Sequence, residues 1–110
     1  MDQKFFQWNV RGLRSKVTDF RDLVFRENPV AVCLQETKLS PDLTADNIGS
    51  YRLFRRDIVP AAVAHGGVAI AVRGDIPSFP FPLRTDLQAV AIVIQLYSFK
   101  LTVCSLFLDA

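Results

Sequence analysis

The sequence predicts an α/β protein in which an N-terminal βαβ unit is followed by mainly antiparallel strands, together forming part of a two-sheet sandwich. Two observations support this fold class. Two short apolar segments, each typical of a strand, flank a stretch whose apolar residues recur at helical spacing. From residue 51 onward, strand-like segments are separated by turn residues rather than by helices.

The first third of the chain contains the βαβ unit. Its expected elements are a strand from Lys4 to Trp8, a helix from Lys16 to Glu27 with Ser15 as its N-cap, and a strand from Ala31 to Gln35. Asn28-Pro29 ends the helix, because proline cannot continue it and restricts the residue before it. The second strand is apolar throughout, as a strand buried on both faces should be.

The rest of the chain, after the βαβ unit, is predicted to form strands that pack as a second layer. The expected elements are a polar loop from Ser40 to Ser50, strands at Tyr51 to Arg56 and Val68 to Val72, a structureless segment fixed by Pro77, Pro80 and Pro82, and a hairpin of Leu87 to Tyr97 with Leu101 to Leu108. In the strand that follows Gly66-Gly67, large residues alternate with Ala69 and Ala71. The large face should meet a second sheet, and the small face should let another layer approach.

Two polar residues come directly after the strands of the βαβ unit, and they are the candidate site. Asn9 follows the first strand and Glu36 follows the second. A right-handed crossover makes the strands parallel, and neighbouring strands lie about 5 Å apart, so both side chains should face one crevice. A carboxylate beside an amide suits weak binding of Mg²⁺ or Mn²⁺, because Mg²⁺ is often held by one or two carboxylates and by water. The alternatives are a turn asparagine and a solvated loop carboxylate.

Charge is informative only in its distribution. The net charge of +2 does not identify a nucleic-acid-binding protein, but residues 1–16 carry four basic residues against one acidic residue. Three of the basic residues, Arg11, Arg14 and Lys16, follow Asn9 directly. They would border the crevice, where they suit a phosphate backbone, although a solvated basic loop is the simpler alternative.

Composition points to an incomplete domain in a reducing compartment. Half of the 110 residues are hydrophobic and the mean hydropathy is +0.22, which is apolar for so short a chain. No apolar run approaches the ~20 residues of a membrane span, and Met1 to Lys4 does not resemble a signal peptide. Cys33 and Cys104 lie in apolar strand patterns and are expected to be buried free thiols. His65, the only histidine, is expected to be a loop residue without a catalytic role.

Three blocks of the sequence are Phe6 to Lys16, Leu34 to Leu39 and Gly66 to Val72. Taken together, they resemble the endonuclease/exonuclease/phosphatase family and in particular the apurinic-type endonuclease domain of LINE-like (non-LTR) retrotransposons. The resemblance implies a DNase I-like α/β sandwich, a Mg²⁺-dependent endonuclease acting on DNA, and an intracellular, nuclear location. Residues 1–110 would be the N-terminal half of that domain, with Asn9 and Glu36 as catalytic residues, Glu36 as metal ligand, and no membrane association.

The resemblance also implies a defect. Phe107 stands where the family has an active-site tyrosine, and it lacks the hydroxyl that would bind the phosphate. The family's Asp-x-Asn and terminal Asp-His pairs would lie beyond the part of the domain that this sequence covers. Hydrolysis requires an activated water, phosphate stabilisation and leaving-group assistance, so we expect the chain to be inactive alone.

Two function classes therefore remain open: a truncated or degenerate endonuclease, and a non-catalytic α/β module that binds nucleic acid or protein. We further expect poor solubility. Apolar residues that the complete domain would bury should be exposed in this half, and self-association or the missing half should cover them. These residues are Val90, Ile92, Ile94, Leu101, Val103 and Phe107.

Overall fold

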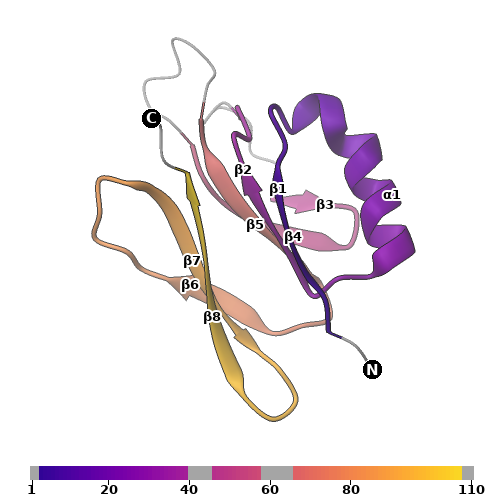
Figure 1. Ribbon diagram of the computed structural model, residues 1–110. Helices are drawn as coiled ribbons and strands as arrows, with labels where there is room; N and C mark the ends of the chain where they lie inside the picture. The colour runs from indigo at the N-terminus through magenta and orange to yellow at the C-terminus, as the bar shows by residue number, and fades with distance from the viewer. Residues whose placement is uncertain (1–2, 40–45, 58–65, 108–110) are drawn as a thin grey trace.

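The computed structural model describes residues 3–39, 46–57 and 66–107, which form three layers: one helix, a five-stranded sheet and a three-stranded sheet (Figure 1). The elements are β1 (Phe5–Asn9), a 3₁₀ turn η1 (Arg14–Lys16), α1 (Val17–Glu27), β2 (Ala31–Gln35), β3 (Asn47–Ile48), β4 (Tyr51–Arg56), β5 (Val68–Arg73), β6 (Ser78–Phe81), β7 (Gln88–Gln95) and β8 (Lys100–Phe107). The α/β fold class with an N-terminal βαβ unit is confirmed.

The larger sheet has the strand order β1-β2-β5-β4-β3, and only its first pair is parallel. The crossover through α1 makes β2 return parallel to β1, as the sequence predicts. The two-residue strand β3 was not predicted, since Ser40 to Ser50 was expected to be a loop. It pairs with β4 through a turn at Gly49 and Ser50.

The helix begins one residue later than expected and ends where expected. Ser15 is not its N-cap, because Ser15 lies within η1 and its Oγ donates to the carbonyl oxygen of Gly12 at 3.1 Å. Asn28 adopts a left-handed conformation and donates its N–H to the carbonyl of Val24, after which Pro29 prevents continuation. Phe20 is fully buried and meets Tyr51 edge to face, with ring centroids 5.8 Å apart.

The alternation along β5 separates two cores, as predicted. Ala69 and Ala71 face α1, where small side chains let the helix approach the sheet. Ile70 and Val72 face the second sheet and pack against Ile92. Burial of these apolar faces stabilises each layer against the next, at about 25 cal/mol per Å² removed from water.

The smaller sheet has the order β6-β7-β8 and packs on the face of the larger sheet opposite α1 (Figure 1). The β7–β8 hairpin is confirmed, with a turn in which the Leu96 N–H donates to the carbonyl of Phe99. The prediction that the proline-rich segment is structureless was wrong, because Ser78–Phe81 forms β6. Pro80 is tolerated there because β6 is an edge strand.

The expectation that the inner residues of this sheet are exposed was also wrong. Ile92 and Ile94 are fully buried, Val90, Leu101 and Val103 pack against the same core, and Phe107 is half-buried. The exposed apolar surface lies instead on the outer face of the sheet. We call Phe79, Phe81 and Leu106 the outer-face cluster; they are 48%, 47% and 41% exposed.

One side of the sandwich is open. Both β1 and β8 are edge strands, and β8 lies over β2 and β5 rather than over β1. Phe5, Gln7 and Asn9, which share the β1 face that points toward the second sheet, are therefore exposed. Within the described residues, no strand pairs with either free edge.

Candidate functional site

The candidate site lies at the carboxyl ends of β1 and β2. These strands are hydrogen-bonded neighbours, and Asn9 is the register partner of Gln35. Asn9 is the last residue of β1 rather than the first residue after it, and its side chain is exposed. Glu36 comes one residue after the end of β2 and is partly exposed. The predicted adjacency of the two strand ends is therefore present, whereas the roles of both residues remain predictions.

The two loops that leave these strands are joined to each other. The N–H of Val10 donates to the carbonyl of Gln35 at 3.0 Å, and the N–H of Gly12 donates to the carbonyl of Glu36 at 2.8 Å. Arg11 and Glu36 both have left-handed backbones, with φ of 50° and 53°. Such conformations are uncommon outside glycine and concentrate at functional sites. At Glu36 the turn also ends the alternation of side chains that β2 maintains.

Glu36 is the acidic group that this site offers. No hydrogen bond or ion pair joins its side chain to another residue in the described ranges, so its carboxylate oxygens are available to a ligand. Those ranges also contain no group of three or more His, Cys, Asp or Glu residues arranged to hold a metal. A single carboxylate fits Mg²⁺ that keeps most of its water, and it does not fit a tightly held ion.

Basic residues border the site on the β1 side. Arg11 and Arg14 are exposed and Lys16 is partly buried, and all three lie in the loop and η1 that follow β1. Sequence reasoning overlooked Lys38, which is exposed, follows Glu36 by two residues and has a φ of 53°. Its side chain reaches toward Gly12, where a Cβ would lie 3.9 Å from the Lys38 Cδ. Its position directly after Glu36 and Thr37 was the signal that could have identified it.

A buried polar contact supports the end of β2 from the second sheet. Ser105 is 1% exposed, and its Oγ accepts a hydrogen bond from Gln35 Nε2 at 3.1 Å and donates one to the carbonyl of Leu34 at 3.0 Å. Gln35 is itself buried. We call Gln35 and Ser105 the inter-sheet pair. Sequence reasoning did not identify it, because its members are 70 positions apart and lie in different sheets.

Comparison with known proteins agrees with this architecture. The model of the endonuclease/exonuclease/phosphatase family matches residues 6–105. The chain belongs to this family. A DNA-(apurinic or apyrimidinic site) endonuclease from Dictyostelium discoideum is 46% identical over 39 residues, which are 34% of this chain and 11% of that protein.

Solved structures share the fold at low sequence identity. The endonuclease domain of TRAS1, a telomere-specific non-LTR retrotransposon, matches with a TM-score of 0.71 and 17% identity, over 94% of this chain and 44% of its own. The AP endonuclease LMAP from Leishmania major matches with a TM-score of 0.70 and 18% identity, over 97% and 40%. The chain thus forms a partial DNase I-like sandwich and spans less than half the length of these structures.

The C-terminal end of β8 can be located relative to the Glu36 loop. Phe107, for which the sequence predicts the position of the family tyrosine, is the register partner of Gln88. Gln88 Oε1 accepts a hydrogen bond from the N–H of Gly67 at 2.9 Å, and the carbonyl of Gly67 accepts one from the N–H of Thr37. The Phe107 end of β8 therefore lies at the same end of the molecule as Glu36. His65 lies outside the described residues.

The two cysteines differ in their burial. Cys33 is half-buried, and its burial, with a smaller contribution from Cys104, raises the pKa of its thiol to about 11. Cys104 is exposed, so the prediction that both thiols are buried was wrong for this residue. It lies on the outer face of β8, where it is the register partner of Ala91.

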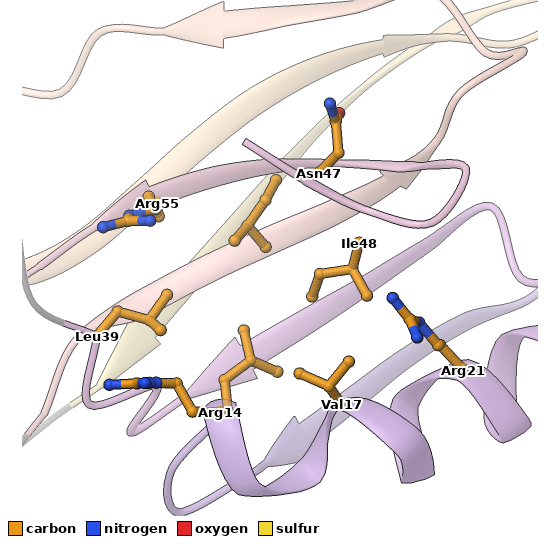
Figure 2. A pocket seen from close by; sticks show the side chains of 9 residues that line it. Arg14, Val17, Arg21, Leu39, Asn47, Ile48 and Arg55 are labelled. Carbon is orange, nitrogen blue, oxygen red and sulfur yellow. The ribbon is translucent and has the colours of Figure 1, made fainter. Parts of the chain in front are cut away.

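A separate hollow of about 220 Å³ lies between the start of α1 and the β3–β4 hairpin (Figure 2). Its floor and walls are mostly apolar, and Val17 and Ile48 lie across it from each other. Arg14 and Arg55 lie toward one end and Arg21 toward the other (Figure 2). Asn9 and Glu36 do not line the hollow, so it is distinct from the candidate site although Arg14 borders both.

Proposed function

We propose that this chain is the N-terminal half of a Mg²⁺-dependent DNA endonuclease domain, and that it is catalytically silent by itself. The observation that carries the proposal is the parallel pairing of β1 with β2, which brings Asn9 and the Glu36 loop to one sheet edge in a member of this family. Ligands of α/β sheets collect at this edge.

Each residue has a role that its chemistry supports. Glu36 would hold Mg²⁺ through its carboxylate, with water completing the shell, and Asn9 would donate its amide N–H to a phosphate oxygen. When bound, the ion would polarise the phosphate and stabilise its developing charge. Arg11, Arg14 and Lys16 would contact flanking phosphates, which position a DNA backbone without reading its sequence.

The proposed silence follows from the groups that these residues do not supply. Glu36 cannot both hold the ion and serve as general base, and general acid–base assistance contributes about 10²–10⁴ in rate. The half-buried Phe107 has no hydroxyl to donate to the phosphate. The chain's length, less than half that of the matching structures, is consistent with a site whose other groups come from elsewhere.

The retrotransposon type is the finer part of the proposal. It rests on the three sequence blocks and on the fold shared with the TRAS1 endonuclease domain. A nuclear, reducing location would accompany such a function. Within the described residues, no helix has the length and apolar character needed to cross a membrane.

A second candidate function, a non-catalytic module that binds nucleic acid or protein, is supported by the outer-face cluster. Exposed apolar patches of this kind mark interaction surfaces or sites of self-association. The open side of the sandwich adds two unpaired strand edges, which also favour association. We propose that the missing half of the domain, or a second copy of the chain, covers these surfaces.

Nicking of supercoiled plasmid in Mg²⁺ tests the proposal, with the TRAS1 endonuclease domain as the active reference and light scattering to define the species assayed. We expect no nicking by the 110-residue chain above the level of its Glu36→Ala variant. DNA binding that persists in EDTA and is unchanged by Glu36→Ala would favour the non-catalytic module. A monomer that nicks DNA and loses this activity on Glu36→Ala would contradict the proposed silence.

A further inference from the structure

The loop that carries Glu36 is held from two sides by backbone hydrogen bonds. On the β1 side, the N–H groups of Gly12 and Leu13 donate to the carbonyls of Glu36 and Thr37 at 2.8 and 2.9 Å. On the β5 side, the N–H groups of Thr37 and Lys38 donate to the carbonyls of Gly67 and Gly66 at 3.2 and 2.9 Å. We call these four bonds the loop ladder. They continue the sheet beyond the ends of its strands.

The ladder flanks two backbone conformations that are uncommon for residues with side chains. Glu36 and Lys38 each have a φ of 53°, in the left-handed region that residues with side chains rarely adopt. Such residues stay in this region only where the surrounding structure determines their conformation. The direction of the Glu36 side chain therefore depends on the bonds that hold residues 36 to 38.

On the β5 side of the ladder, a side chain at Gly67 would clash with Thr37. A Cβ at this position would lie 2.6 Å from Thr37 Oγ1 and 3.7 Å from the backbone N of Lys38. Thr37 is fully buried, and within the described residues its hydroxyl has no hydrogen-bond partner, so packing alone fixes it. Gly67 also has a φ of 86°, which favours glycine.

The second sheet holds Gly67 in turn. Gln88, the first residue of β7, accepts the Gly67 N–H through its side-chain Oε1 at 2.9 Å. This is a hydrogen bond between a side chain of the smaller sheet and the backbone that supports the Glu36 loop. It links the position of that loop to the packing of the two sheets.

We infer that Gly67 and Gln88 are positioning residues for the Glu36 carboxylate. The absence of a side chain at residue 67 lets Thr37 pack against the start of β5, and Gln88 keeps the Gly67 backbone in place to complete the ladder. The inference rests on the proposed function insofar as the positioned carboxylate is taken to hold Mg²⁺.

The test compares Gly67→Ala with Gly49→Ala. Gly49 also has a positive φ, 58°, but a Cβ there would meet no atom within 4 Å, so this variant carries the backbone strain without the contact. Hydrogen exchange is measured at the Gly12, Thr37 and Lys38 amides, against Val32 in the central sheet, and Mg²⁺ affinity is measured from amide chemical shifts.

In Gly67→Ala we expect exchange at Thr37 and Lys38 to rise about tenfold or more, with Val32 unchanged. We expect the apparent Mg²⁺ dissociation constant to rise about tenfold, and Gly49→Ala to match wild type in both measurements. Adding Thr37→Ala to Gly67→Ala removes the obstructing hydroxyl and should recover most of the lost protection relative to Thr37→Ala alone.

If Gly67→Ala fails to fold, Gln88→Leu replaces it, with Gln95→Leu at the other end of β7 as its control. We expect faster exchange at Thr37 and Lys38 in Gln88→Leu only. The inference would be overturned if hydrogen exchange at Thr37 and Lys38 were the same in each test variant as in its control. This holds whatever Mg²⁺ affinity is measured. If the wild-type protein protects these amides from exchange but shows no Mg²⁺-dependent chemical shift, the proposed metal function is refuted instead. The positioning role is judged from hydrogen exchange alone.

Discussion

Removal of the Ser105 hydroxyl should destabilise the protein through the inter-sheet pair. The hydroxyl is 1% exposed and bonds both Gln35 Nε2 and the carbonyl of Leu34. Ser105→Ala leaves the buried Gln35 amide without this acceptor, and an unsatisfied buried polar group costs about 1–3 kcal/mol. Because small proteins lose about 1–3 kcal/mol of stability per molar urea, the unfolding midpoint should fall by roughly 0.3–3 M.

A second variant separates this cost from simple loss of volume. Replacing both partners with apolar groups, in Gln35→Leu/Ser105→Ala, removes the unsatisfied amide and should recover most of the lost stability. Ser98→Ala, at an exposed position in the β7–β8 turn, should change stability by less than about 0.5 kcal/mol. Urea unfolding followed by circular dichroism measures all three. A midpoint for Ser105→Ala equal to that of Ser98→Ala would refute the reasoning.

Three further predictions follow from burial. At pH 8 iodoacetamide should modify the exposed Cys104 well before Cys33, because burial raises the pKa of the Cys33 thiol to about 11 and little thiolate forms. Mass spectrometry measures the two rates of modification, and equal rates would contradict this prediction. Phe81→Lys in the outer-face cluster should lower the mass measured by light scattering, whereas Tyr97→Lys, at a fully exposed turn, should not. Phe20→Ala should lower stability by about 3–5 kcal/mol in thermal unfolding, because the side chain is fully buried between α1 and the larger sheet, where it meets Tyr51 of β4. A loss below about 1 kcal/mol would contradict this and would show that the surroundings collapse into the space.

Sequence patterns correctly predicted those elements that a strong local signal specifies. The strands Ala31–Gln35 and Tyr51–Arg56 have the predicted bounds, because apolar runs and turn residues delimit them. The alternation of large and small residues in β5 also predicted which face meets each layer. Patterns misled where tertiary contacts prevail. Pro80 suggested an irregular segment, yet an edge strand loses little by lacking an N–H.

The candidate site shows the same division. The placement of Asn9 and Glu36 at the ends of adjacent strands could be predicted from the sequence to within one residue, because parallel strands end at the same sheet edge. The contacts that hold the loop could not, since they join residues far apart in the chain, such as Thr37 with Gly67 and Gln35 with Ser105. These contacts depend on the register between strands and on the packing of two sheets, which local periodicity does not specify.

The most direct test of the account is a titration of the 110-residue chain with Mg²⁺, monitored by the chemical shifts of its backbone amides. We predict weak, saturable shifts confined to residues 9–12 and 35–38, absent from Glu36→Gln, because one carboxylate and one amide hold a largely hydrated ion. Shifts that are scattered over other acidic residues such as Asp46, Asp57 and Asp75, and that persist in Glu36→Gln, would contradict a metal site at the ends of β1 and β2.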